Sequence, residues 1–142
     1  MEERCAPIGW KANKVKRVVR STLAAEALAL EEVIEHAIFT RKLLGEMLGI
    51  SKVVPIEVWT DNDAYTAVHA STQIDDRRLR VEIASIKENM AKEAVVVRWC
   101  RGDEMLANGL TKKGASCEQL FKVISCGTIA KNFKGRKTGE FN

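Results

Sequence analysis

The sequence lacks the cysteine spacing that marks a structural metal site. It holds four cysteines and two histidines, and no two cysteines stand at C-x-x-C spacing. The cysteines are Cys5, Cys100, Cys117 and Cys126. A structural zinc site, which needs several such ligands at typical spacings, is therefore not expected. Scattered free thiols in a reducing compartment are the better interpretation.

Long apolar runs are also missing. No stretch approaches the roughly 20 apolar residues that a membrane-spanning helix needs. The short acidic N-terminus does not have the form of a signal peptide. We therefore expect an intracellular protein, cytoplasmic or nuclear, without a membrane partner.

What the sequence does hold is the balance of a globular domain. Of its 142 residues, 46% are hydrophobic and 30% are charged, which suits one apolar core. Residues 1–130 are expected to form this domain, and the basic segment 131–142 a tail that is disordered or makes accessory electrostatic contacts. The net charge of +4 fits a nucleic-acid partner, but many proteins without one carry a similar charge.

The strongest periodic signal predicts a long helix. From Ser21 or Thr22 to about Leu48, apolar residues recur on one stripe, and Gly49 marks the end. Before this helix, the valines and the tryptophan of Pro7–Ser21 favour two short strands around a turn, although their alternation is imperfect.

The rest of the chain alternates strands and helices. The predicted elements are a strand at Val53–Thr60, a helix to about His69, a helix from Asp75 or Asp76, a strand at Ala94–Trp99, a helix from Glu104 towards Lys113, and a last helix capped by Ser116. This order predicts an α/β fold with a parallel component, because strands joined through helices usually run parallel.

Glu26 is the first candidate for chemistry. On the long helix it falls on the flank of the apolar stripe, beside Val33, Ala37 and Leu44. An acid turned towards a sheet needs a cation or another partner, because an unpaired buried carboxylate is costly. An acid near a helix N-terminus is also ordinary, and Arg41 falls in the same stripe. Spacing alone therefore leaves both interpretations open.

Asp61 is the second candidate. It directly follows the predicted buried strand, and in open α/β sheets ligands bind at the carboxyl ends of the strands. The same residue could simply cap the next helix, which is a very common use of aspartate. Taken alone, the cap is the more common of these two roles.

Together these acids belong to a wider pattern. The sequence carries W-K-x-x-K at Trp10, S-T-x-x-A-E-A at Ser21–Ala27, T-D-N at Thr60–Asn62 and L-A-x-x-L-T-K ending at Lys112. In these segments, which span most of the chain, it resembles the RNase H-like domain at the end of copia-type retrotransposon Pol polyproteins. The resemblance implies an RNase H-like mixed sheet flanked by helices, and cutting of the RNA strand in an RNA–DNA hybrid.

The resemblance also implies which residues take part. Members of the family use four carboxylates to hold two divalent ions, Mg²⁺ or Mn²⁺, about 4 Å apart. Glu26 matches the helix acid and Asp61 the strand acid, so both are implied as catalytic metal ligands. Asn108 stands where the family has its last catalytic aspartate, and an amide brings neither charge nor base. Glu104, one turn earlier on the predicted helix, is a candidate partial substitute.

The first acid of the family has no counterpart. It lies on a strand before the Trp10 hairpin, and only Met1 to Ala6 precede that hairpin. The sheet is therefore expected to lack its first, central strand. Upstream sequence, a second chain in a homodimer or strand swap, or the hairpin pairing beside the Asp61 strand would then complete it. With two of four acids, we expect weak metal binding at best.

Two functions remain open. One is a truncated or degenerate ribonuclease H of a Pol polyprotein, inactive as it stands. The other is a non-catalytic module that binds nucleic acid or mediates dimerisation. Arg77, Arg78 and Arg80 are candidate phosphate contacts for either, although a solvated helix face is the commoner explanation. A transposase or integrase core is disfavoured, because those enzymes order their acids Asp, Asp, Glu and the order here is Glu, Asp, Asn.

Overall fold

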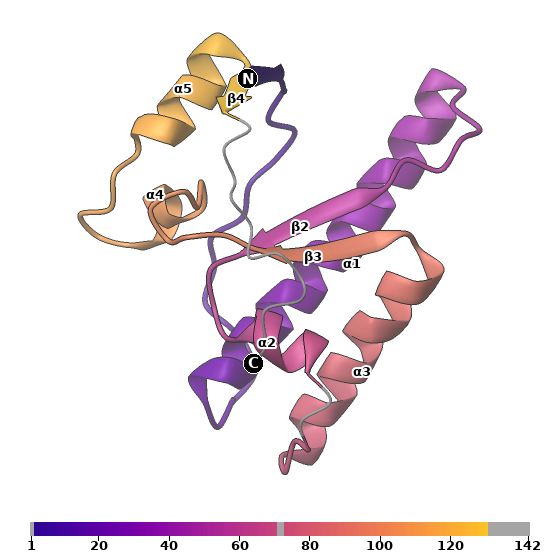
Figure 1. Cartoon of the computed structure of the whole chain (residues 1–142), viewed down its shortest axis with the longest axis vertical. Coiled ribbons are helices and arrows are strands. Elements are labelled where there is room, and N and C mark those ends of the chain that lie inside the picture. The colour runs from indigo at the N-terminus through magenta and orange to yellow at the C-terminus, as the bar shows by residue number, and fades with distance from the viewer. Residues whose placement is uncertain (1, 71–72, 131–142) are drawn as a thin grey trace. The chain divides into compact units, whose positions relative to one another are not determined.

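The computed structural model describes residues 2–70 and 73–130, and the chain divides into two compact units (Figure 1). Residues 15–98 form one of them, here named the helical unit. Residues 1–14 and 99–142 belong to the other, here named the terminal unit. The predicted basic tail, 131–142, lies outside the described residues.

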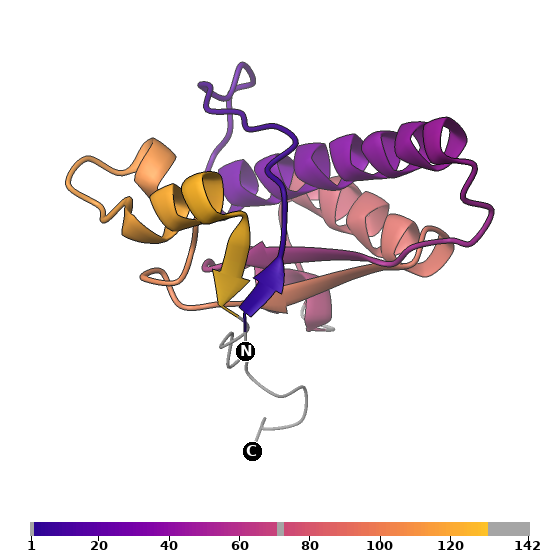
Figure 2. The same ribbon diagram turned by 90° about the horizontal axis from the view of Figure 1, so that it is seen from above.

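The helical unit combines helices with a small sheet, so the predicted α/β class is confirmed at this level. Its elements are α1 (Thr22–Leu48), β2 (Ile56–Thr60), α2 (Ala64–His69), α3 (Arg77–Lys92) and β3 (Val95–Trp99), whose last residue crosses into the terminal unit. Strands β2 and β3 pair with each other as a two-stranded sheet. Helices α1 and α3 pack together and lie over the same face of this sheet (Figure 2).

The two strands of this sheet run parallel. The N–H of Ile56 donates to the carbonyl of Ala94 at 3.0 Å, which places the starts of both strands side by side. Carbonyls alternate in direction along a strand, so the carbonyl of Val97 points away from β2. Nε2 of His69, on α2, lies 3.1 Å from that carbonyl and donates to it. The outer edge of β3 is therefore covered at this point by a side chain.

The predicted helix boundaries at both ends of α1 are confirmed. Ser21 is extended and its side chain accepts a hydrogen bond from the N–H of Ala24 at 3.1 Å, which satisfies one donor of the first turn. Gly49 ends the helix with φ 65°, a left-handed conformation that glycine adopts at little cost. The buried stripe between these ends consists of Ala27, Leu30 and Ile34.

The terminal unit joins the two ends of the described chain. Its elements are β1 (Glu2–Arg4), α4 (Asn108–Thr111), α5 (Glu118–Cys126) and β4 (Thr128–Ala130). Strands β1 and β4 pair antiparallel, with Arg4 opposite Thr128. The N–H of Cys5 donates a hydrogen bond to the carbonyl of Gly127 at 2.8 Å, which extends this ladder by one bond. The sequence analysis did not predict this pairing.

The two strands predicted in Pro7–Ser21 are wrong. The structure describes every residue of this segment and assigns it no strand. Trp10 is 77% exposed and Val18 is 88% exposed, so neither side chain packs on a sheet. Their strand preference reflects packing against a pleated neighbour, and here that neighbour is missing. A hairpin beside the Asp61 strand is therefore not the way in which this sheet is completed.

The helix predicted from Glu104 to Lys113 is much shorter than expected. Residues 102–104 form a turn, in which the N–H of Glu104 donates to Arg101, and α4 begins only at Asn108. Glu104 and Asn108 therefore do not share a helical face, and the argument for Glu104 as a substitute acid fails. The start of the last helix agrees better, because the hydroxyl of Ser116 accepts the N–H of Glu118 at 3.3 Å.

The charged residue that interrupts the stripe of α1 has a structural role. Nη1 of Arg41 donates to the carbonyls of Val54 and Glu93, and Nη2 lies 2.6 Å from Oε2 of Glu93. The Arg41 side chain is 14% exposed. One guanidinium thus joins α1 to the chain entering β2 and to the chain entering β3.

Replacing Arg41 by methionine should destabilise the helical unit. Methionine keeps the apolar stem but removes the donor to the exposed carbonyl of Val54 and the donors to the part-buried carbonyl and Oε2 of Glu93, which costs on the order of 2 kcal/mol. Chemical denaturation should show this loss. Lys42→Met is the matched control, because Lys42 meets the same Glu93 from a side chain that is 60% exposed, and should cost under about 1 kcal/mol. Similar losses for both variants would contradict the role given to Arg41.

Candidate functional site

Glu26 lies on the second turn of α1. It is half-buried and flanks the stripe formed by Ala27, Leu30 and Ile34, as its spacing predicted. Because α1 packs against β2, the acid is carried by a helix that rests on the strand leading to Asp61. Glu26 and Asp61 belong to the same compact unit.

Asp61 stands at the carboxyl end of β2 and does not cap the helix that follows. The side chain of Asn62 accepts the N–H of Ala64 at 2.9 Å, and the N-cap position of α2 is Asp63, whose side chain makes no capping bond. The half-buried Asp61 follows Thr60, which is 4% exposed. The bond expected of a cap to the N–H of Ala64 is thus made by Asn62, the neighbour of Asp61.

Asn108 belongs to the terminal unit and has a clear local role. Its Nδ2 donates a hydrogen bond to the carbonyl of Gly102, which closes the turn between β3 and α4. Aspartate at this position would place a carboxylate beside this carbonyl. Both groups only accept hydrogen bonds, so no bond would form between them. The amide is therefore the side chain that this turn requires.

The acids do not form a built metal centre. Across residues 2–70 and 73–130, no three histidine, cysteine, aspartate or glutamate side chains gather closely enough to hold an ion. The carboxylates of Glu26 and Asp61 have the oxygen chemistry that Mg²⁺ and Mn²⁺ prefer. Two acids balance less charge than a pair of divalent ions carries, so the donor set present here does not fit a two-metal site.

The three candidate phosphate contacts on α3 divide into two groups. All three side chains are exposed near the start of the helix. Arg77 and Arg78 line a groove together with Arg17 and Arg20, whereas Arg80 is not among the lining residues. Sequence reasoning missed Arg17 and Arg20, because no periodic signal links the segment before α1 to the first turn of α3.

A buried acid pair is a second feature that sequence reasoning missed. Glu82, on the inner side of α3, is 9% exposed and forms an ion pair of 2.8 Å with Arg17. A hydrogen bond shared with the carboxyl group of Glu31, followed by burial and by the charge of Glu31, raises the pKa of Glu82, while Arg17 opposes the shift. Oε2 of Glu82 has no donor while both acids are ionised.

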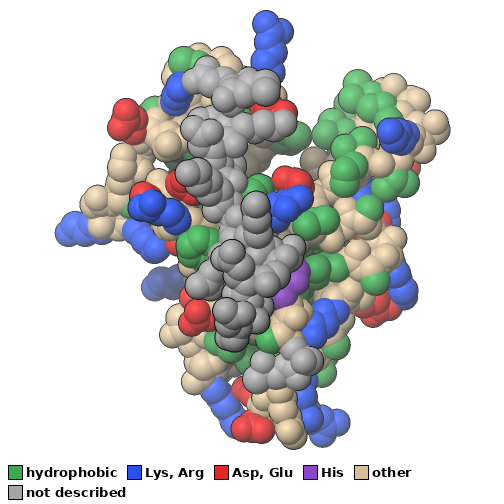
Figure 3. Space-filling model, in the orientation of Figure 1, with side chains coloured by type: hydrophobic (Ala, Val, Ile, Leu, Met, Phe, Trp, Pro, Cys, Tyr) green, Lys and Arg blue, Asp and Glu red, His purple; other side chains and the backbone are tan. Residues whose placement is uncertain are grey.

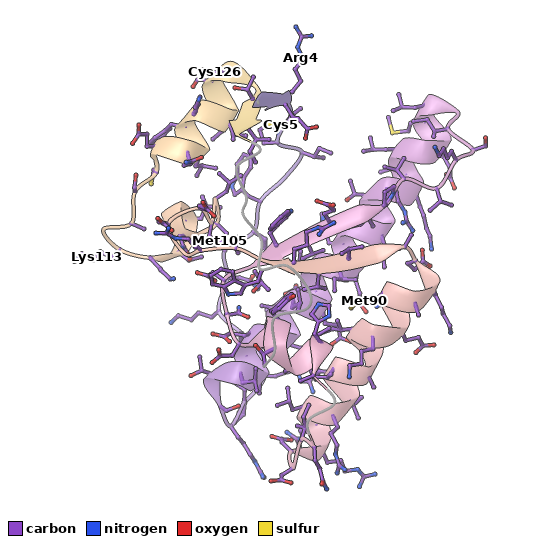
Figure 4. All side chains as sticks on the ribbon, in the orientation of Figure 1. Arg4, Cys5, Met90, Met105, Lys113 and Cys126 are labelled. Carbon is purple, nitrogen blue, oxygen red and sulfur yellow. The ribbon has the colours of Figure 1, made fainter. Side chains whose placement is uncertain are left out.

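The free thiols predicted from the cysteine spacing are present, and two of them share a cavity. All four cysteines are free, and Cys100 is buried. Cys5 and Cys126, labelled in Figure 4, line a cavity of about 600 Å³ in the terminal unit with Arg4 and Thr128. The histidine-free lining gives these thiols no base, so the cavity does not resemble a cysteine-based catalytic site.

No protein-family model matches the chain, and neither the curated proteins nor the solved structures contain a significant match to it. Within the described residues, none of the helices is both long enough and apolar enough to cross a membrane.

Replacing Glu82 by glutamine should stabilise the protein at neutral pH. Because the pKa of Glu82 is raised, the folded chain holds this proton more tightly than the unfolded chain. The resulting stability is complete below the ordinary value of 4.5 and is lost as pH rises through the raised pKa. Glutamine stays neutral, accepts from Arg17 and donates to Glu31. Denaturation at pH 7 should show a gain on the order of 1 kcal/mol that shrinks towards pH 4.5.

Glu88→Gln is the control for this experiment. Glu88 lies on the exposed side of the same helix, and its hydrogen bond with Lys92 lowers its pKa. Its contribution has the opposite sign, so the variant should lose a little stability at pH 7 and converge with the wild type at acidic pH. A loss of stability at pH 7 in Glu82→Gln would mean that the ion pair with Arg17 outweighs the acid pair.

Metal binding should be weak and should depend on Glu26. With Glu26 and Asp61 as the two candidate ligands, at most one Mg²⁺ or Mn²⁺ per chain is expected by calorimetry, and Glu26→Gln should abolish the signal. Glu35→Gln removes an exposed carboxylate from the same helix and should leave the signal unchanged. Two tightly bound ions per chain would contradict this expectation.

Proposed function

We propose that the chain is a degenerate RNase H-type domain, related to the domain at the end of copia-type retrotransposon Pol polyproteins, and that its present sequence does not hydrolyse RNA. The observation that carries this proposal is the position of Asp61, directly after the carboxyl end of a strand that has buried residues. Glu26, on the helix that packs against that strand, is the second acid that the proposal requires.

The chain connectivity of the helical unit supports the same proposal. The chain runs from β2 through α2 and α3 to β3, which is parallel to β2. Helices α1 and α3 both cover one face of this sheet (Figure 2). Since His69 covers the outer edge of β3 at Val97, a further strand would be added beside β2. The proposed central strand, from upstream sequence or from a second copy in a homodimer, belongs at that position.

Loss of hydrolysis follows from the donor set. In-line cleavage of a phosphodiester by this class needs two ions, which stabilise the attacking and the leaving oxygen atoms. Glu26 and Asp61 would orient at most one ion, and Asn108 offers neither charge nor a base. Removing a member of a cooperating catalytic set usually lowers the rate by several orders of magnitude.

A second candidate function is a nucleic-acid-binding module that lacks catalysis. The arginines that line one groove of the helical unit favour it, because phosphate contacts do not require the acids. The RNA–DNA hybrid that the ancestral domain would cut is then the natural ligand to test. Binding without cutting would be compatible with both candidates.

The unaltered chain should not cut the RNA strand of a labelled RNA–DNA hybrid in Mg²⁺. Asn108→Asp alone should not restore cutting, and it should lower stability by about 1–2 kcal/mol, because the carboxylate loses the bond to Gly102 and faces its carbonyl. Asn108→Asp together with an aspartate-bearing strand fused upstream should give Mg²⁺-dependent cutting. The readout is the length of the labelled RNA fragments.

The control is the double variant Glu26→Gln, Asp61→Asn, which detects a contaminating nuclease. Hybrid-specific cutting by the unaltered chain that disappears in this variant would overturn the proposed loss of activity. If the restored chain folds with a sheet of the expected size and still does not cut, the RNase H ancestry itself is wrong.

A further inference from the structure

A groove of about 610 Å³ lies in the helical unit, between the segment that leads into α1 and the first turns of α3. Arg17 and Arg20 come from that segment, and Arg77 and Arg78 from α3. The apolar part of the lining consists of Val18, Val19, Ala24, Leu28 and Leu79. Cationic side chains are visible at the corresponding end of the molecule, where the first turns of α1 and α3 lie (Figure 3).

One of the four arginines fixes the wall of the groove. Nη1 of Arg17 lies 2.8 Å from Oε1 of Glu82, and the Glu82 side chain is 11% exposed. This ion pair fastens the irregular segment before α1 to the second turn of α3. It also places the charge of Glu82 inside the wall, where Arg17 balances it. The groove is therefore held in shape by a contact that leaves the other arginines unengaged.

The remaining three arginines carry uncommitted charge. Arg20, Arg77 and Arg78 are exposed, and none of them has an ion pair within the part of the chain that the structure describes. The carboxylate of Asp76 accepts the N–H groups of Arg78 and Leu79, at 2.8 and 3.3 Å.

Asp75 is exposed, and Glu82 is the third acid of the lining. Four arginines thus face three acids, which leaves a net charge of +1 on the lining. This positive balance, with the exposed guanidinium groups of Arg20, Arg77 and Arg78, fits an anionic ligand.

We infer that this groove binds the phosphodiester backbone of a nucleic-acid strand, with the guanidinium groups of Arg20, Arg77 and Arg78 on its phosphates. Guanidinium groups match phosphate oxygens in charge and in hydrogen-bond geometry. Among the described residues, none of those that line the groove is an aromatic on which a base could stack. Recognition therefore depends on the backbone, so RNA and DNA strands should bind alike and with little dependence on base sequence.

The groove is a different feature from the acids. Ala24 and Leu28 line it, and Glu26, between them on the helix, faces another direction because residues two apart lie on opposite sides of a helix. The inference rests on the proposed function only in choosing nucleic acid as the polyanion. It adds the surface that holds the strand, whether or not the acids bind metal.

The test removes the three uncommitted arginines together in the full chain. Arg20→Ala, Arg77→Ala, Arg78→Ala is compared with the unaltered chain by fluorescence anisotropy, using labelled single-stranded RNA and DNA of the same sequence over a series of KCl concentrations. Each phosphate contact with a single strand contributes about 0.7 to the slope of log affinity against log salt. Loss of three contacts should make the slope about 2 shallower and weaken binding at low salt by about tenfold or more.

The matched control removes the same charge outside the groove. Lys52, Lys87 and Lys92 are exposed cations of the helical unit that do not line it, and replacing all three by alanine should keep most of the affinity and slope. Circular dichroism verifies folding. If the groove variant does not fold, Arg20→Ala alone should still lower the slope by about 0.7.

Three outcomes would overturn the inference. They are equal losses in the groove and control variants, absence of strand binding by the unaltered chain, and binding of RNA without DNA. The variant Glu26→Gln, Asp61→Asn should bind strands as the unaltered chain does. The proposed RNase H ancestry is tested by hybrid cutting in the restored chain, whereas the groove is tested by strand binding. Either proposal can therefore fail while the other stands.

Discussion

Burial of one stripe of α1 determines where the other elements of the helical unit lie. Ala27, Leu30 and Ile34 are at most 6% exposed, and a single helix cannot cover its own stripe. Helix α3 and strand β2 provide that cover. Each large apolar side chain removed from water contributes about 1.5–3 kcal/mol, so this contact outweighs any polar contact at the surface. The same contact sets α1, and with it Glu26, beside the strand that ends at Asp61.

Two charged side chains interrupt the apolar stripes of the helices, and both have long-range partners. Arg41 of α1 makes three hydrogen bonds to Val54 and Glu93, which offset the cost of its burial. Glu82 of α3 is less well matched, because Arg17 satisfies one oxygen and the other faces the acid Glu31. A charged residue within an apolar stripe therefore indicates a polar contact between two elements. The sequence does not reveal which residue is its partner, or whether all of its polar atoms are hydrogen-bonded.

What the sequence predicted well is what local interactions determine. Helices α1 and α3 were predicted with their caps, because periodicity and capping depend on neighbouring residues. The strands predicted in Pro7–Ser21 were wrong, because a strand needs a partner that local sequence does not supply. The pairing of β1 with β4 joins segments from opposite ends of the chain, and each strand is only three residues long. Neither length nor periodicity could have indicated it.

Asp61 and Asn108, one in each unit, are two candidate residues for which a local explanation can be tested. For Asp61, the local explanation failed, because its neighbour Asn62 makes the bond that a cap would make. For Asn108, the local explanation holds, because its amide donates to the carbonyl of Gly102. A carboxylate at position 108 would be tolerable beside that carbonyl if a bound cation offset its charge. Without such a cation the amide is the more stable side chain, because it donates to the carbonyl that a carboxylate would repel.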